Sequence, residues 1–188
     1  MAFVVLRQRF CCAKPATIPQ ERQAFANEIM EKKELLSNVL IRDMCAGDEP
    51  LVNEFFDSMG FESRAFFNRT DYNRNGALKY CKNPHPTRRY WIAEYEGKMA
   101  GYVFFMDYNT SIPCLGIAVR DDLKGLHLGT TLMNFAINHI KEAGKGGIQL
   151  TTVFANVRAQ MLYEKMGFRC MGQYKNGQEF FYLYRFVD

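Results

Sequence analysis

The spacing of hydrophobic and polar positions along this chain predicts alternating helices and strands. Between residues 21 and 36, Phe25, Ile29 and Leu36 recur near helical spacing among charged residues, which is typical of a surface helix. Helices are also expected after Asp48, from about Glu62 to Asn68, from Gly129 to Ala143 and from Val157 to Met166. Extended apolar runs predict strands at Val39–Met44, Tyr90–Tyr95, Met99–Asp107, Cys114–Val119, Ile148–Phe154, Phe168–Tyr174 and Glu179–Phe186.

Cap and turn residues set the limits of these elements. Asp48 is expected to cap its helix, with Pro50 in the first turn, and Gly144 is expected to end the helix that begins at Gly129. The polar stretch that ends at Pro84 is interpreted as a loop. From residue 39 the order is β-α-α-β-β-β-α-β-α-β-β. We therefore expect one domain over residues 39–188, preceded by a helical appendage over residues 1–38 that packs on it or on a second subunit, which leaves a homodimer open.

Composition narrows the protein class. The 188 residues are 48% hydrophobic and 14% aromatic, enough to fold one ordinary domain and too many for a disordered chain. No apolar run reaches the roughly 20 residues that cross a bilayer, so no membrane span is expected. The net charge of +4 comes from interleaved basic and acidic residues, which is not typical of a nucleic-acid partner. The apolar start ends at Arg7 and the cysteines form no CxxC pair, so we expect a reducing, cytoplasmic location.

Three short motifs indicate binding sites only weakly. The segment 71–76 matches half of a calcium loop, but the twelfth position, which must be a carboxylate, is Lys82. Cys81 and His85 are a lone ligand-type pair where structural zinc needs four ligands, so no metal is expected and a buried thiol with an exposed imidazole is the alternative. The aromatic segment 101–105 is typical of an RNA-binding strand, but it lacks the opening basic residue and glycine and fits a core strand.

The strongest pattern for a binding site lies between residues 117 and 130. The strand residues Ile117, Ala118 and Val119 precede a glycine-containing loop that leads into a helix. The first turn of such a helix exposes unpaired N–H groups and the positive end of the helix dipole, and Lys124 adds a charge. A diphosphate is the anion that such a site fits. The loop residues are Lys124, Gly125, Leu126, His127, Leu128, Gly129 and Thr130.

Together with a later motif, this segment resembles the GNAT superfamily of acetyl-coenzyme A-dependent N-acyltransferases. The family's loop motif is matched by Lys124 and Gly129. Its later motif is matched by Asn156, Ala159, Tyr163, Gly167 and Phe168. The resemblance covers about four-fifths of the chain. It implies an α/β (α+β) fold with a mixed, mostly antiparallel, splayed sheet flanked by helices, and acetyl-coenzyme A as co-substrate without a metal.

The resemblance also implies roles for individual residues. The pantetheine arm is expected between the strand 114–119 and the strand that begins at Ile148, along the backbone of Ile117 and Val119. Tyr163 is expected to be the general acid, because a phenol of pKa about 10 is well matched to a thiol of pKa about 8.5. An aromatic side chain packed on the helix is the alternative. Asn156 is expected to cap its helix, to meet the pantetheine amide, or both.

Two positions depart from the family pattern. His127 stands where the family usually has glycine, and Pro113 stands where a proton-relaying glutamate is often found. The general base is therefore left open between Glu94, Glu96, Asp107 and water alone.

The acceptor cleft is expected over residues 61–80 and 107–113. This stretch offers Arg64, Phe66, Phe67 and Arg69, so its walls look more aromatic than acidic. A small amine, an amino sugar, a peptide terminus and a lysine side chain all stay open as acceptors.

The resemblance thus implies an N-acetyltransferase that moves an acetyl group from acetyl-coenzyme A to a primary amine. The first alternative is a domain of the same fold that binds coenzyme A or a protein partner without turnover. The second is a nucleic-acid-binding module, which predicts binding with a steep salt dependence.

Overall fold

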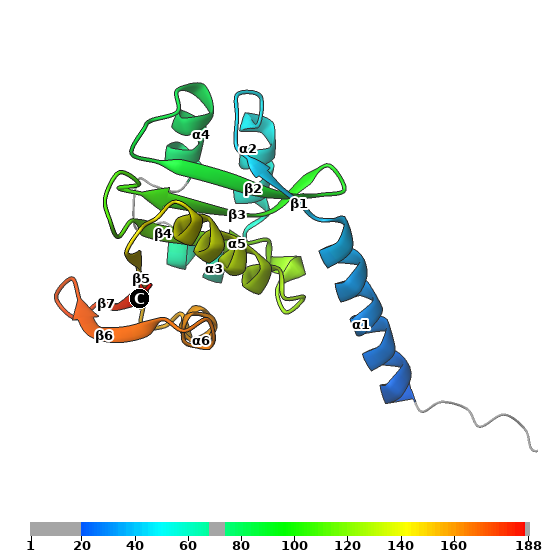
Figure 1. Ribbon diagram of the computed structural model, residues 1–188. Helices are drawn as coiled ribbons and strands as arrows, with labels where there is room; N and C mark the ends of the chain where they lie inside the picture. Colours follow the sequence, from blue (N-terminus) through cyan, green and yellow to red (C-terminus); the bar gives the residue numbers. More distant parts are fainter. Residues whose placement is uncertain (1–19, 68–73, 187–188) are drawn as a thin grey trace, which may run out of the picture.

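The computed structural model describes residues 20–67 and 74–186. A seven-stranded mixed sheet forms the centre of the molecule, with strand order β1-β2-β3-β4-β5-β7-β6 (Figure 1). The strands are β1 (Leu40–Asp43), β2 (Arg89–Tyr95), β3 (Lys98–Met106), β4 (Cys114–Val119), β5 (Gly147–Val153), β6 (Arg169–Tyr174) and β7 (Glu179–Arg185). The helices are α1 (Gln20–Asn38), α2 (Glu49–Ser58), α3 (Phe61–Phe67), α4 (Arg74–Lys82), the 3₁₀ turn η1 (Asp121–Leu123), α5 (Leu128–Glu142) and α6 (Val157–Lys165).

Two apolar layers cover the two faces of the sheet. Side chains alternate between the faces of a strand, so β3 sends Val103 and Phe105 to one layer and Tyr102 and Phe104 to the other. The first layer includes the buried face of α5, and the second includes α2 and α4, which lie on the opposite side (Figure 1). The aromatic segment 101–105 is therefore core, as its interpretation as a core strand predicts.

The sheet is splayed between β4 and β5, the one parallel pair of neighbours in the described sheet. Every other pair is antiparallel, and β4 and β5 share a single register position, Cys114 opposite Gln149. The Gln149 amide donates to the Pro113 carbonyl oxygen at 3.1 Å, and its side-chain amide donates to the Ile112 carbonyl oxygen at 2.9 Å. Beyond this point the two strands separate. The mixed, mostly antiparallel, splayed sheet flanked by helices is thereby confirmed.

One helix that the sequence analysis interprets as loop is α4. Its buried face consists of Gly76, Ala77, Tyr80 and Cys81, which pack beside α2 on the sheet. The polar residues between them hide this face in the sequence. Arg74 fixes the helix to α2 by donating hydrogen bonds of 2.6 and 2.8 Å to the Asn53 side-chain oxygen. The preceding residues of the calcium-like motif, and Arg69, lie outside the described part of the chain.

Asp48 occupies the N-cap position of α2, as expected, and its carbonyl oxygen accepts a hydrogen bond from the Val52 amide at 3.0 Å. Its carboxylate, however, makes no capping bond to the start of α2. It is buried, accepts two hydrogen bonds from the Arg42 guanidinium at 2.8 and 2.9 Å, and accepts one from the Cys45 amide at 2.8 Å. Asp48 therefore joins β1 to the loop before α2, which a sequence pattern of caps does not reveal.

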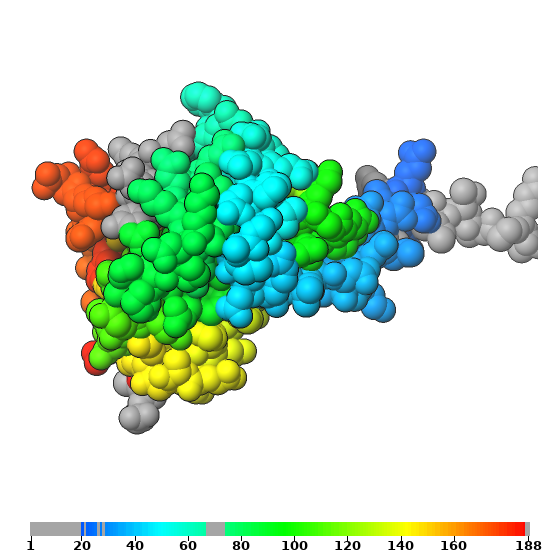
Figure 2. Space-filling model, turned by 90° about the horizontal axis from the view of Figure 1, so that it is seen from above, coloured from blue at the N-terminus to red at the C-terminus, as the bar shows by residue number. Residues whose placement is uncertain are grey.

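Helix α1 leaves the body of the protein (Figures 1 and 2). Its last turn buries Leu35 in the α5 layer, whereas Phe25, Ile29 and Met30 are exposed. The division at residue 38 stays a prediction, since residues 1–19 lie outside the description. Among the described helices, none is both long and apolar enough to span a bilayer.

Candidate active site

A cavity of about 1340 Å³ opens where β4 and β5 part. Its wall includes all the predicted cofactor-binding residues except Leu126, which packs against the core. The residues on the wall are Ile117, Ala118, Val119, Lys124, Gly125, His127, Leu128, Gly129, Thr130, Asn156 and Tyr163. The fold thus brings the two motifs of the sequence analysis to one place, although about 30 residues separate them.

The outer edge of β4 borders this cavity with backbone groups that no described strand pairs. Arg120, just after β4, donates its amide to the Ala100 carbonyl oxygen of β3 at 2.8 Å. Because backbone groups alternate in direction along a strand, the amides and carbonyls of Val119 and Ile117 point the other way, toward β5. β5 has already separated there, so these groups are open to an extended ligand.

The loop from Gly125 to Thr130 presents a row of backbone donors. The first amide after the loop with a protein acceptor is that of Thr131, which donates to the His127 carbonyl oxygen at 3.1 Å. Within the described part of the chain, no amide from residue 125 to residue 130 donates to a protein atom. These donors sit at the positive end of the 15-residue helix α5. This is the chemistry of an anion site.

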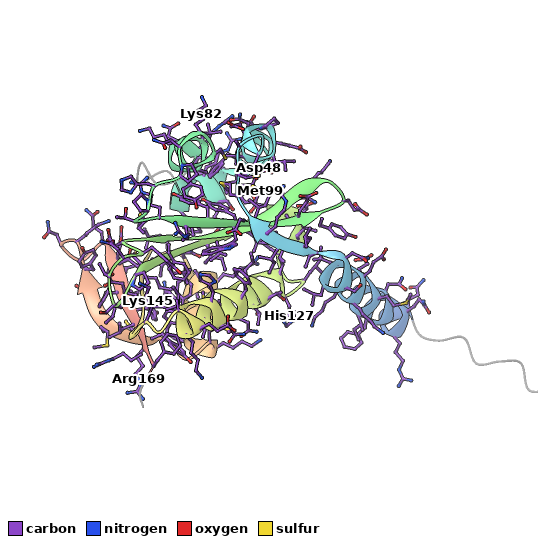
Figure 3. All side chains as sticks on the ribbon, turned by 45° about the horizontal axis from the view of Figure 1, so that its top comes forward. Asp48, Lys82, Met99, His127, Lys145 and Arg169 are labelled. Atoms are coloured by element: carbon purple, nitrogen blue, oxygen red, sulfur yellow. The ribbon has the colours of Figure 1, made fainter. Side chains whose placement is uncertain are left out.

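His127 is accommodated in this loop by a left-handed backbone, with φ of 66°. Its side chain is exposed, at the start of α5 and on the side from which α1 departs (Figure 3). Partial burial, with the positive charges of Lys32 in α1 and Lys165 in α6, lowers the pKa of His127. These surroundings favour the neutral imidazole, and the left-handed backbone of His127 makes a turn of the kind that glycine adopts readily.

Lys124 has a protein partner that the sequence analysis did not foresee. Its ammonium pairs with Asp121 and donates to the Ser63 hydroxyl at 2.6 Å. Asp121 also accepts from the Gly60 amide at 2.6 Å. Burial acts to raise the pKa of Asp121, but the bonds from Lys124, Ser63 and Gly60 outweigh it, so the pKa is lowered. Lys124 therefore anchors the loop to α3 as well as lining the cavity.

Lys165 is a cation that the sequence analysis missed. It lies on the cavity wall at the end of α6, its side chain is exposed, and its charge reaches His127. No carboxylate of the described residues forms an ion pair with it. Its place on the second helix beside the loop appears only after folding, and the sequence signal is only its position two residues after Tyr163.

Two residues of the motif on α6 have different environments: Asn156 caps the helix, as predicted, and Tyr163 is buried. The Asn156 side chain caps α6 by accepting the Ala159 amide at 3.3 Å. Tyr163 is 7% exposed, with its ring against Phe168 and Tyr182. Burial raises the pKa of Tyr163 well above its usual value, with smaller contributions from Cys114 and Tyr182. The Tyr163 side chain therefore packs in the core and also lines the cavity.

The candidate bases differ in position. Glu94 accepts a hydrogen bond from Arg42 at 2.9 Å on β2, two strands away from β4, and Glu96 lies in the β2–β3 turn; neither lines the cavity. Asp107, at the end of β3, does line it. Arg64, expected in the acceptor cleft, instead donates to the backbone carbonyl oxygens of Met59 and Asp57.

Carboxylates line the cavity where the sequence analysis expects mainly aromatic walls. Phe66 lines the cavity, and Glu62 and Glu179 line it as well. Glu179 is the first residue of β7, where it faces the cavity with Phe181. A carboxylate at the head of the otherwise apolar run 180–184 is the sequence signal that could have singled it out.

In the part of the chain that the structure describes, no group of three or more His, Cys, Asp or Glu side chains could hold a metal ion. Cys81 is buried, and burial raises its pKa to about 11. His85 is exposed and bonds to the Thr87 hydroxyl. Both findings agree with the non-ligand alternative for this pair.

Comparisons with known proteins agree with this geometry. A stretch of 92 residues is 30% identical to a Bacillus subtilis (strain 168) protein described as a candidate N-acetyltransferase of the alanine of ribosomal protein bS18. The match covers 49% of this chain and 61% of that relative.

Solved structures are similar in fold. The ribosomal-protein-S5-alanine acetyltransferase of Vibrio fischeri superposes with a TM-score of 0.68 at 14% identity, covering 80% of this chain and 94% of that one. The spermidine N-acetyltransferase of Vibrio cholerae, in complex with CoA and spermine, gives 0.61 at 21% identity, covering 78% and 94%. The model of the acetyltransferase (GNAT) family matches residues 52–168, and the chain therefore belongs to this family.

Proposed function

We propose that the protein transfers an acetyl group from acetyl-coenzyme A to a primary amine, with Tyr163 as the proton donor. One observation carries the proposal: the row of unpaired amides from residue 125 to residue 130 opens onto the same cavity as the parted edge of β4. A diphosphate on the amides and an extended amide-bearing arm along the strand edge match the two ends of coenzyme A.

The residues of the chain divide the work of binding. The loop amides and the dipole of α5 receive the diphosphate, and Lys165 adds the charge that Lys124 partly shares with Asp121. The amides of Ile117 and Val119 hold the pantetheine arm as a neighbouring strand would, and Asn156 keeps the start of α6 in place. These contacts fix the thioester at the seam between the strands.

Acetyl-coenzyme A supplies a thioester, whose carbonyl carbon is open to attack by a neutral amine. A free β4 amide stabilises the charge that develops on the carbonyl oxygen. Tyr163 gives its proton to the departing thiolate. Because burial raises the pKa of this phenol, it stays protonated throughout the neutral and mildly alkaline range.

The proposal is tested by calorimetry with coenzyme A and by thiol release from acetyl-coenzyme A with a panel of primary amines. We expect saturable binding and amine-dependent release. Tyr163→Phe removes only the hydroxyl, so turnover should fall by about ten- to a thousandfold with cofactor affinity unchanged.

Phe168→Leu, which alters the ring packed against Tyr163, is the matched control for packing, and it should keep most of the turnover. Unchanged turnover in Tyr163→Phe would remove the phenol from its role. Cofactor binding without thiol release for any amine would instead favour the alternative of a domain that binds coenzyme A without turnover.

A further inference from the structure

Glu179 carries a buried carboxylate oxygen without a partner. The residue is 8% exposed. Its Oε1 receives a hydrogen bond from the Lys175 ammonium at 3.3 Å, whereas its Oε2 is buried and has no hydrogen-bond partner among the described residues. Leaving such a group unsatisfied is unfavourable, and more so for a charged group. A buried, unsatisfied oxygen on a residue of the cavity wall therefore indicates a missing ligand group.

The fold places the Glu179 side chain on the cavity wall. Glu179 pairs with Val153 of β5 and with Tyr174 of β6, so the carboxylate starts from the middle of the β5–β7–β6 arm. Alternate residues Phe180 and Tyr182 turn to the α6 side, which leaves Glu179 and Phe181 on the cavity face.

The thiol of Cys114 ties this carboxylate to the reaction seam. Cys114 is the first residue of β4 and the one that pairs with β5 in the described sheet. Burial raises its pKa to about 11, and among the surrounding charges are Asp107, Lys175 and Glu179. Cys114 in turn contributes to the raised pKa of Tyr163. Glu179, Tyr163 and Cys114 all lie on the wall of the same cavity.

The charged groups around Glu179 carry a net negative charge, which one further cation would balance. Lys175 satisfies one carboxylate oxygen from the rim, where its side chain is 48% exposed. Asp107 adds a second negative charge to the same wall. A primary ammonium group carries three N–H donors and one positive charge, which is the complement of the unpaired oxygen.

We propose that Glu179 binds the ammonium group of the acceptor through Oε2 and accepts its first proton. The proposal rests on the proposed acetyl transfer and assigns its acceptor side. The ammonium gives one proton to Glu179, and the resulting amine nitrogen attacks the thioester carbonyl carbon. The C–N bond forms, the nitrogen loses a second proton to water, and the C–S bond breaks. The thiolate takes its proton from Tyr163, which regains one from water. The products are an acetamide, a free thiol and one proton that Glu179 returns to solvent.

The experiment compares two probe amines on wild type, Glu179→Gln and Glu142→Gln. One probe is α-N-acetyl-lysinamide, whose ε-amine has a pKa of about 10.4, and the other is alaninamide, whose α-amine has a pKa of about 8. At pH 8 the first is almost wholly protonated and the second is partly neutral. We expect Glu179→Gln to lower kcat/KM by about a hundredfold for the first probe and about tenfold for the second.

Binding is measured separately by titrating each probe into the coenzyme A complex. Glu179→Gln should weaken probe binding by about tenfold and leave coenzyme A affinity unchanged. Lys175→Gln acts in the opposite direction: it removes the cation that shares the carboxylate, so probe binding should tighten by a few-fold. This second variant keeps the test decisive should Glu179→Gln fold poorly. Glu142, an exposed carboxylate in the last turn of α5 away from the cavity, is the matched control and should behave as wild type.

The outcomes separate the two proposals. Wild-type protein that neither binds coenzyme A nor releases thiol overturns the proposed acetyl transfer. If cofactor binding is normal but Glu179→Gln binds both probes as tightly as wild type, the role of Glu179 is overturned and the acetyl transfer stands. Equal losses of kcat/KM for both probes overturn the proton-accepting step. A wild-type coenzyme A complex that binds neither probe at about 10 mM, a concentration that detects even a weak ligand, overturns the binding site.

Discussion

The two halves of the sheet differ in how much of each is covered. In the half made of β1 to β4, strand β3 is buried along nearly its whole length, because α2 and α4 cover one face and α5 the other. In the arm made of β5, β7 and β6, α6 covers one face and the other lines the cavity. Strand β6 is mostly exposed. The first half is thus covered on both faces, whereas the arm leaves one face open to the cavity.

Both halves contribute residues to the seam, the place where β4 and β5 meet at Cys114 and Gln149 and then separate. One register position joins β4 to β5, so the open edge of β4 and the start of α5 come from the first half, while Tyr163 and Glu179 come from the arm. The difference in coverage explains this division: a face with no helix on it can carry a carboxylate and still reach a bound molecule.

The largest effect is expected from removing one aromatic ring from each half. Phe105 on β3 is fully buried between Trp91 and Tyr108, whereas Phe181 on β7 is only partly buried and faces the cavity. Phe105→Ala should lower the free energy of unfolding by about 3–5 kcal/mol, because it leaves a cavity in a closed core. Phe181→Ala should cost about 1–2 kcal/mol, since its side chain gains less from burial.

Urea unfolding followed by circular dichroism measures both variants. Equal losses of unfolding free energy would contradict the division of the sheet into a stabilising half and a ligand-facing arm. Coenzyme A affinity, measured for Phe181→Ala, checks that the milder variant keeps its fold.

The seam is probed by adding volume at Gly129, in the first turn of α5. A Cβ placed there would lie 3.4 Å from Leu162 of α6 and 3.8 Å from Val119 of β4, which is ordinary contact. Gly129→Ala should therefore be tolerated. Gly129→Val adds two methyl groups in the same narrow space between the halves, and we expect coenzyme A to bind about ten- to a hundredfold more weakly, or about 1.4–2.7 kcal/mol.

Calorimetry on the pair separates space from backbone, because both replacements remove glycine and only one is bulky. Wild-type affinity in Gly129→Val would count against a diphosphate at the start of α5.

The smallest effect concerns the anchor that ties the loop to the first half. The pKa of Asp121 is lowered in the folded protein, because bonds from Lys124, Ser63 and Gly60 outweigh its partial burial. A carboxyl whose pKa is lower when folded stabilises above its unfolded pKa of about 3.9, and this contribution is lost as pH falls through the folded value.

The urea midpoint of the wild type should fall as the pH drops below about 4, and this fall should be less steep in Asp121→Asn. The difference in the pH slope should correspond to less than one proton, and the slope near neutral pH should change little. Asp122→Asn, which removes a neighbouring exposed partner of Arg120, is the control. The same slope in wild type and Asp121→Asn would show that the anchor contributes nothing.

Periodicity predicted most of the fold because each element buries a regular face. The strands stand out since β3 and β4 carry long apolar runs, and α5 repeats Leu132, Met133, Ala136 and Ile140 at helical spacing. Periodicity did not predict helix α4, because its buried face consists of only four residues and includes a glycine. The capping bond from the Asp48 carboxylate is absent for another reason: a tertiary partner, Arg42, competed for the carboxylate that a local rule assigns to the helix start.

The site was predictable where one local segment builds it. The loop from 124 to 130 and the Asn156–Tyr163 motif are short sequences whose geometry is set by their own strand and helix. Lys165 and Glu179 were missed because their place at the cavity depends on how β5, β7 and α6 return to the seam. The second role of Lys124 was missed for the same reason, since Ser63 is about 60 residues away in the chain.

The turn between β6 and β7 has a consequence for how such a protein can diversify. Lys175, Asn176 and Gly177 adopt left-handed backbone conformations in succession, directly beside Glu179 and outside the covered half of the sheet. Exposed turns of this kind accept insertions and exchanges with little loss of folding. A lineage can therefore reshape one wall of the cavity by remodelling a single hairpin, while the loop before α5 and the open edge of β4 are inherited intact.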